Sequence, residues 1–331
     1  MTTCPKEWGL GSLGEHSLKG LSRPEWAEET LEAAATAGVA QLPRASTAAS
    51  LCMFLGRAHA AVGYAETAVA LEVEPGFEPF APGWASMLEA GAHLFAGRPD
   101  LWLEICGALT TRGGVAEVAG LCGMLHMLPA VGRGDEARAI AERTLTAARG
   151  YGNPFFALVA YGRAFSSTEP ARALAVLREG LDYTRRQRVL NWEGHLAAEA
   201  ASVEAACGNL DEAFHLFGFA IDTLHRAGNQ ANLAVTLADP ALVFGRMGRP
   251  DVAATIYGAS SHDPGTARVL GLVEEIDRLR STLGEAVFDG CVAAGAVMEP
   301  GEAVRYARAQ IQAARRALPA LARPRPDRPA R

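Results

Sequence analysis

The chain has 331 residues, of which 49% are hydrophobic and 21% charged, and its formal net charge at pH 7 is -6. This length suits one elongated domain or two globular ones, and the acidic balance excludes a general nucleic-acid binder, which would carry a basic face. Alanine, leucine, glutamate and arginine dominate while β-branched residues are few, so the composition favours helix.

The cysteines and the apolar runs bear on where the protein is found. The six cysteines are scattered without CxxC spacing, which indicates buried free thiols in a reducing cytosol. No uninterrupted apolar run reaches membrane-spanning length, and the N-terminus lacks a basic region followed by an apolar stretch. We therefore predict a cytoplasmic protein with no membrane partner.

Residues 1–30 differ from the rest of the chain and are predicted to be mostly irregular. The run GLGSLG at 9–14 matches the pattern G-x-G-x-x-G, but a dinucleotide site needs a strand before it and a helix opening inside it. Neither is predicted here, so we expect no cofactor. Further along, the sequence predicts a helix over 25–37.

Two more helices are predicted before a long loop. Ser46 and Thr47 are good N-cap residues and predict a helix over 48–62, and 64–73 reads as a second helix. Prolines and glycines between 75 and 83 then predict the loop.

A repeat can be recognised in the sequence after residue 97. Acidic helix starts follow turn phrases and recur at steps of 35, 34, 42 and 40 residues. Acids suit the first turn of a helix because they complement its exposed amides and dipole. Repeats of this length are typical of tetratricopeptide-like (TPR-like) helix hairpins. The starts are Asp100, Asp135, Glu169, Asp211 and Asp251.

The helix after Asp211 shows why these hairpins must stack. Its apolar residues recur at helical spacing and form one wide face, which a single hairpin cannot bury. The face comprises Ala213, Leu216, Phe217, Ala220, Ile221 and Leu224. We predict an all-α fold over 31–250, an α-solenoid of TPR-like hairpins in a right-handed superhelix. Pro240 should kink or split the helix predicted over 230–247.

Two segments resemble known families. The phrase LGEHSLKGLSRPE at 13–25 resembles the closing segment of class III adenylate/guanylate cyclase domains, although the apolar strand that follows in that family is missing. The phrases VAATIYGA at 252–259, LGEAVFD at 283–289 and MEPGEAV at 298–304 are similar to the end of the helical-repeat region in large bacterial ATP-dependent regulators. These include the LAL/MalT-like regulators and cyclase–ATPase–repeat fusions.

The second resemblance implies a C-terminal helical cap over 251–314. A Pro/Arg-rich tail over 315–331 cannot form a core and is predicted to be disordered. The phosphate-binding motif G-x-x-x-x-G-K-[ST] is absent, as are the metal-binding residues of a cyclase domain. We therefore carry over no catalytic activity and no metal site.

The candidate binding residues lie on helices that would be the first of their hairpins, which line the concave groove of TPR arrays. Aromatic side chains there are typical anchors for a partner, with core packing as the plainer interpretation. The groove candidates are His93, His126, Tyr161, Trp192 and His195.

Two functions stay open at this point. The first is a non-catalytic interaction or regulatory module that binds a protein or peptide in its groove. The second is a regulatory remnant of a nucleotide cyclase or ATPase, acting in cyclic-nucleotide signalling or transcription control. The first rests on the repeat array, and the second on the phrase at 13–25.

Overall fold

The computed structural model describes residues 36, 41–75, 81–152, 154–260 and 272–321, and within them the chain is all-α, without a strand. The N-terminal helices are α3 (Gln41–Phe54), α4 (Ala58–Glu72), α5 (Trp84–Phe95), α6 (Asp100–Leu109) and α7 (Gly114–Met127), which continues into the 3-10 helix η2 (Leu128–Val131). The central helices are α8 (Gly134–Gly150), α9 (Phe155–Phe165), α10 (Pro170–Gln187), α11 (Leu190–Ala206), α12 (Leu210–Ala227) and α13 (Gln230–Arg246). The C-terminal helices are α14 (Pro250–Ser260), α16 (Val273–Leu283), α17 (Glu285–Ala296) and α18 (Pro300–Leu321).

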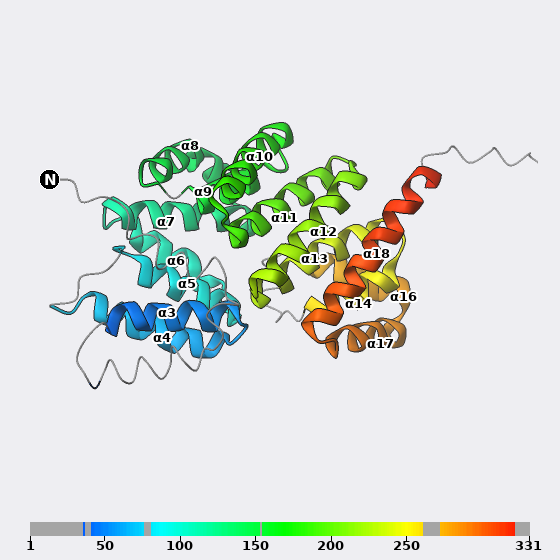
Figure 1. Cartoon of the computed structure of the whole chain (residues 1–331), viewed down its shortest axis with the longest axis horizontal. Helices are drawn as coiled ribbons and strands as arrows, with labels where there is room; N and C mark the ends of the chain where they lie inside the picture. The colour runs from blue at the N-terminus through cyan, green and yellow to red at the C-terminus, as the bar shows by residue number, and fades with distance from the viewer. Residues whose placement is uncertain (1–35, 37–40, 76–80, 153, 261–271, 322–331) are drawn as a thin grey trace, which may run out of the picture.

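From α3 to α14, successive helices pack against one another along a curved path, and α14, α16, α17 and α18 are grouped at one side (Figure 1). Beyond these neighbour contacts, α13 also touches α3, although most of the described chain separates the two in sequence. The centre of the array is surrounded by six helices, namely α3, α5, α7, α9, α11 and α13.

The five predicted acidic helix starts are confirmed within one residue. Asp100 opens α6, and the acids of α8, α12 and α14 lie in their first turns. Before α12 and α14, Gly208 and Gly248 adopt φ +85° and +74°, a conformation that suits glycine after a helix end. The turn phrases therefore end one helix and position the next.

The apolar face predicted after Asp211 is confirmed with one exception. Leu216 is only half-buried, whereas Phe214, outside the predicted set, is fully buried. Phe214 packs against Phe244 of α13, with ring centroids 5.3 Å apart. The face is wider than the spacing indicated because α12 is covered on two sides, by α11 and by α18.

The predicted helix over 48–62 is wrong. The structure has α3 over Gln41–Phe54 and α4 over Ala58–Glu72, separated at Gly56 with φ +77°. Thr47 lies inside α3, where its hydroxyl donates to the Pro43 carbonyl 2.8 Å away instead of capping a helix. Proline is tolerated in the first turn of a helix, so the start at Gln41 is compatible with Pro43.

The predicted boundary of the tail at 315 is also wrong. Helix α18 continues to Leu321, and the Arg315 guanidinium binds Asp211 of α12 through contacts of 2.8 and 3.1 Å. Packing on α12 therefore keeps this part of the chain helical. The rest of the tail, the cyclase-like segment and the helix predicted over 25–37 (apart from residue 36) lie outside the described residues.

Helix α13 runs from Gln230 to Arg246 and is not split at Pro240. Pro240 has no N–H, so the Thr236 carbonyl, one turn earlier, lacks its usual helical donor. Both residues are buried.

Helices α14 and α17 cross at very close range. A Cβ added at Gly258 would lie 2.1 Å from the Val292 carbonyl oxygen, and one added at Gly295 would lie 2.0 Å from that of Thr255. Only glycine fits at both positions because the neighbouring atoms are backbone. This crossing anchors the C-terminal helices to the array.

One helical stretch of the described residues, Gly114–Val131, is long and apolar enough to cross a membrane by length and composition, although Glu117 and His126 interrupt its apolar run. It comprises α7 and η2, and α7 packs against α5, α6, α8 and α9.

Candidate functional site

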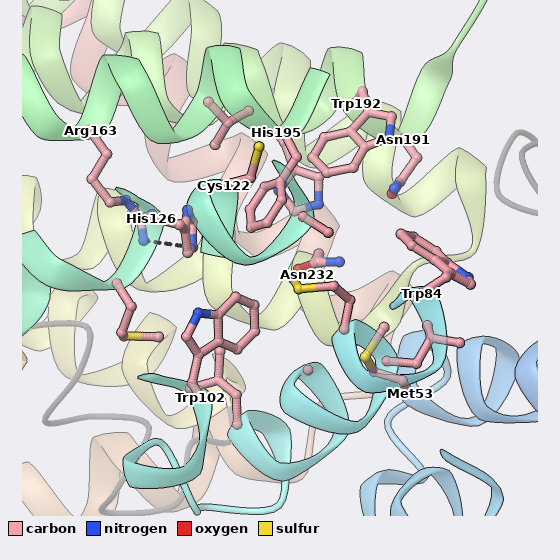
Figure 2. Close-up of a pocket in the computed structure, with 18 of the residues that line it drawn as sticks. Met53, Trp84, Trp102, Cys122, His126, Arg163, Asn191, Trp192, His195 and Asn232 are labelled. Carbon is pink, nitrogen blue, oxygen red and sulfur yellow. Dashed lines mark hydrogen bonds between the residues drawn. The ribbon is translucent and has the colours of Figure 1, made fainter. Parts of the chain in front are cut away.

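A cavity of ≈ 290 Å³ lies inside the array and is lined mainly from α3, α5, α7, α9, α11 and α13 (Figure 2). Each helix contributes residues at helical spacing. From α11, for example, come Asn191, His195 and Glu199, and from α13 come Asn232, Thr236 and Asp239. The cavity therefore collects side chains that are far apart in the sequence.

Aromatic side chains form a continuous wall of the cavity. The Phe156 ring lies 5.2 Å from His126, 5.8 Å from Trp192 and 6.3 Å edge-on from Trp102, measured between centroids. Trp102 is fixed because its indole N–H donates to the Gly123 carbonyl, 2.8 Å away. Tilted and edge-on packing of this kind favours a rigid wall.

The polar and charged side chains of the cavity are concentrated around Arg163 of α9. Its guanidinium forms an ion pair with Glu199 of α11 and donates to His126 Nε2 on α7, 3.1 Å away. A guanidinium is only a donor, so His126 Nε2 must be the acceptor and the imidazole is neutral with its proton on Nδ1. Three helices are thereby joined by polar contacts at the cavity wall.

Both cavity histidines are held neutral. Burial lowers the pKa of His195 to about 4, and the nearby Arg163 charge acts in the same direction. Burial also holds the pKa of His126 well below its usual range, with Arg163 and His195 contributing. Neither imidazole therefore supplies a positive charge at neutral pH.

Asp239 of α13 adds a second carboxyl group to the cavity. Burial raises the pKa of Asp239 to about 7, and the Glu199 carboxylate raises it further, while Arg163 and a hydrogen bond from Ser202 act in the opposite direction. Its partial exposure fits a side chain that lines the cavity. The charge of Asp239 therefore changes close to neutral pH.

Three of the five predicted groove residues are brought together here: His126, Trp192 and His195. The rings of Trp192 and His195 lie 5.5 Å apart. His93 is buried in α5, with 8% exposure, and is not among the lining residues. Its helix contributes to the cavity wall, but the His93 side chain packs within the array.

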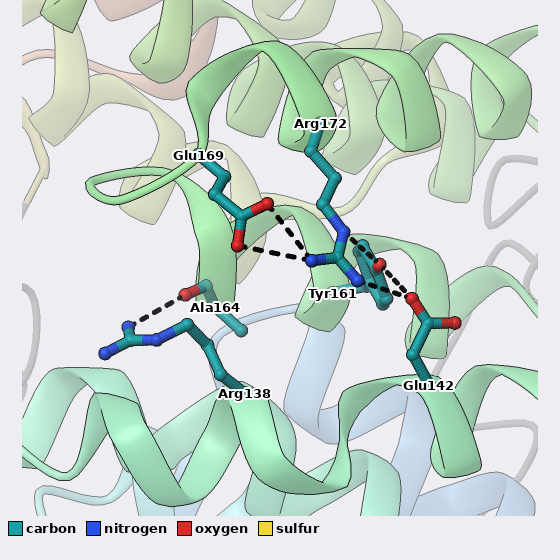
Figure 3. A network of polar contacts seen from close by, with 6 residues as sticks. All are labelled: Arg138, Glu142, Tyr161, Ala164, Glu169 and Arg172. Atoms are coloured by element: carbon teal, nitrogen blue, oxygen red, sulfur yellow. Dashed lines mark hydrogen bonds and ion pairs between the residues drawn. The ribbon is translucent and has the colours of Figure 1, made fainter.

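Tyr161 is not a groove residue. It is 2% exposed and is not among the lining residues, and its side chain lies beside Glu142 of α8 and Arg172 of α10 (Figure 3). Its hydroxyl donates to Glu142 at 2.6 Å and accepts from Arg172 at 2.7 Å. Arg172 also pairs with Glu169, so the network ties the start of α10 to α8 and α9. Its role is structural.

The sequence reasoning missed Arg163, Glu199 and Asp239, which supply most of the polar chemistry of the cavity. A weak signal for Glu199 was available, because it follows His195 at i+4 and therefore shares its helix face. Arg163 and Asp239 carry no such signal, since the charged groups nearest to them in the cavity come from other helices.

Among the described lining residues, the usual parts of a nucleophilic site are missing. Cys122 lines the cavity, but burial raises the pKa of this thiol to about 12, so the reactive thiolate is disfavoured. Among the residues described, no cluster of three or more His, Cys, Asp or Glu side chains is arranged to hold a metal ion. The arrangement suits binding of a small molecule through aromatic contacts and hydrogen bonds.

A scan against protein-family models finds no match for this chain, and a comparison with curated proteins finds no significant relative. The two resemblances noted in the sequence therefore remain predictions.

Proposed function

We propose that this protein is a non-catalytic regulatory module that binds a small amphipathic molecule in its central cavity. The observation that carries the proposal is the closure of the array: α3 contacts α13, and the six inner helices enclose ≈ 290 Å³ between aromatic and polar walls. Ligand sites typically combine a largely apolar lining with a few placed polar groups, as found here.

The resemblance of residues 251–312 to ATP-dependent regulators supports a place for this module in signalling. In such an arrangement the helical array senses a molecule and passes the information to a partner. Cys106, Cys122, Cys207 and Cys291 are free thiols, which supports a cytoplasmic setting.

Three of the five tryptophans line the cavity, so intrinsic fluorescence reports directly on its occupancy: Trp84, Trp102 and Trp192. We expect members of a panel of small aromatic and aliphatic molecules to change this fluorescence saturably and to raise the melting temperature, because a ligand that binds only the folded state stabilises it.

A pair of matched variants tests the location. Ala119 lines the cavity and is half-buried, so Ala119→Phe fills part of the space, whereas Ala171 is exposed on α10 and Ala171→Phe leaves the cavity intact. We expect Ala119→Phe to abolish ligand effects and Ala171→Phe to retain them. Equal binding by both folded variants, or no binding by any panel member, would contradict the proposal.

A peptide or protein partner is the second candidate. Trp84 and Tyr151 line the cavity yet are 37% and 43% exposed, so the cavity opens to solvent beside large aromatic anchors. Trp84→Ala tests this candidate: it should weaken capture of a peptide or protein partner, and unchanged capture would contradict it.

A further inference from the structure

We infer that the ligand of this cavity is an organic cation, an ammonium group on an aromatic or other apolar body. The inference rests on the proposed function and specifies the chemical class that the cavity accepts. It comes from the balance of charges, the supply of hydrogen-bond acceptors and the aromatic wall.

The charges of the cavity leave one carboxylate without a cation. Of the described residues that line it, Arg163 alone carries a permanent positive charge, and it is paired with Glu199. The two imidazoles are neutral, as shown above. No salt bridge is found for Asp239 among the described residues, and the nearby Arg163, which lowers the pKa of Asp239, is already paired with Glu199, so two carboxylates share one guanidinium. The cavity therefore has a surplus negative charge.

Acceptors are available next to this carboxylate. Asp239 follows Thr236 by three residues on α13, and Pro240 deprives the Thr236 carbonyl of its usual N–H donor. Thr236 and Asp239 both line the cavity. An ammonium group has three donors and no acceptor, so it matches a carboxylate next to a carbonyl that lacks its usual helical donor.

The aromatic wall suits the same ligand. The faces of tryptophan and phenylalanine rings attract cations, most strongly when water is excluded. Trp102, Phe156 and Trp192 share the cavity with Asp239. An anionic ligand would instead meet Glu199 and Asp239 and would have to compete with Glu199 for Arg163. The cavity thus selects against carboxylates.

A matched set of three probes tests the inference: 2-phenylethylamine, 2-phenylethanol and phenylacetate share one aromatic body and differ in charge. Binding is followed by tryptophan fluorescence at about pH 8, above the pKa of Asp239. We expect the amine to bind at least about tenfold more tightly than the alcohol, and phenylacetate to bind most weakly.

Asp239→Asn keeps the size of the side chain and removes its charge. It should reduce the preference for the amine over the alcohol to near equality, whereas the control Asp182→Asn, on the exposed face of α10, should leave the preference unchanged. A preference that persists in Asp239→Asn, or parent protein that binds the alcohol as tightly as the amine, would overturn the inference.

Proton release gives an independent readout. Near pH 6 Asp239 is mostly protonated, with Glu199 and Arg163 the charged groups nearest to it and both cavity imidazoles neutral. Binding of the amine should expel this proton, which calorimetry in two buffers of different ionisation heat detects; binding of the alcohol should not.

The outcomes separate the inference from the proposed function. If all three probes bind equally and Ala119→Phe abolishes this binding, the cavity is a small-molecule site but the inference of a cationic ligand is refuted. Failure of 2-phenylethylamine to bind at millimolar concentration also refutes the inference of a cationic ligand. The proposed function is then tested by the panel of small aromatic and aliphatic molecules described above.

Discussion

The crossing of α14 and α17 gives a sharp test of the packing described here. In Gly295→Ala, the new Cβ would lie 2.0 Å from the Thr255 carbonyl oxygen and 2.7 Å from the Ala259 nitrogen, whereas side-chain Cβ atoms essentially never approach closer than 3.0 Å. Both neighbours are backbone, so the contact cannot be relieved by a rotamer change and the helices must move apart by about 1 Å.

The magnitude follows from two opposing effects. Alanine in a helix interior is favoured over glycine by about 1 kcal/mol. Overpacking costs about 1–3 kcal/mol, and a clash with backbone belongs at the upper end of this range. We therefore expect Gly295→Ala to destabilise the C-terminal helices by about 2 kcal/mol.

Gly290 provides the matched control, because it lies in the same helix and a Cβ added there would meet no atom within 4 Å. Gly290→Ala should stabilise by about 0.5–1 kcal/mol. Hydrogen exchange of the α14 and α17 amides measures the local loss of stability. A local measurement is chosen because a chain of many hairpins need not unfold in one step. Equal protection of the two helices in both variants would refute the close crossing.

Three further outcomes follow from buried groups. Phe217 is fully buried, so Phe217→Ala should cost about 3–5 kcal/mol in urea unfolding; a loss below about 1 kcal/mol would contradict this burial. Because the pKa of Asp239 is raised in the folded state, the folded protein loses stability as pH rises from about 4 to about 7. Asp239→Asn should therefore increase the melting temperature more at pH 8 than at pH 5. An equal increase at both pH values would show that ionisation of Asp239 is not the cause. Because the pKa of His195 is lowered to about 4 in the folded state, stability falls as pH decreases from about 6.5 to about 4. His195→Gln should therefore reduce the change of melting temperature with pH over this range. An unchanged slope would argue against a neutral buried imidazole.

Local signals in the sequence predict most of the helices, because a turn phrase, an acid and an apolar stripe all belong to the same helix. The start at Asp211 and the face around Phe217 are examples. The break at Gly56 is not predicted because Ser46 and Thr47 have equally good local chemistry as caps, and only packing decides against it.

The cavity is harder to predict than the helices. His126, Trp192 and His195 are aromatic or titratable residues on inner helices, which makes them candidates, and they do meet. Arg163 and Asp239 escape prediction because their importance depends on neighbours contributed by other helices. His93 and Tyr161 lie on inner helices too, but the rotation of each helix, set by tertiary packing, turns them away.

The contact between α3 and α13 also has a consequence for how the protein folds. In an open row of hairpins each unit depends only on its neighbours, and the ends can unravel independently. Here the first described hairpin rests against a helix far along the chain, so loss of either one exposes the other. Helices α3 and α13 should therefore unfold together, and a cut in the exposed turn at Gly132–Gly134 should leave fragments that remain associated.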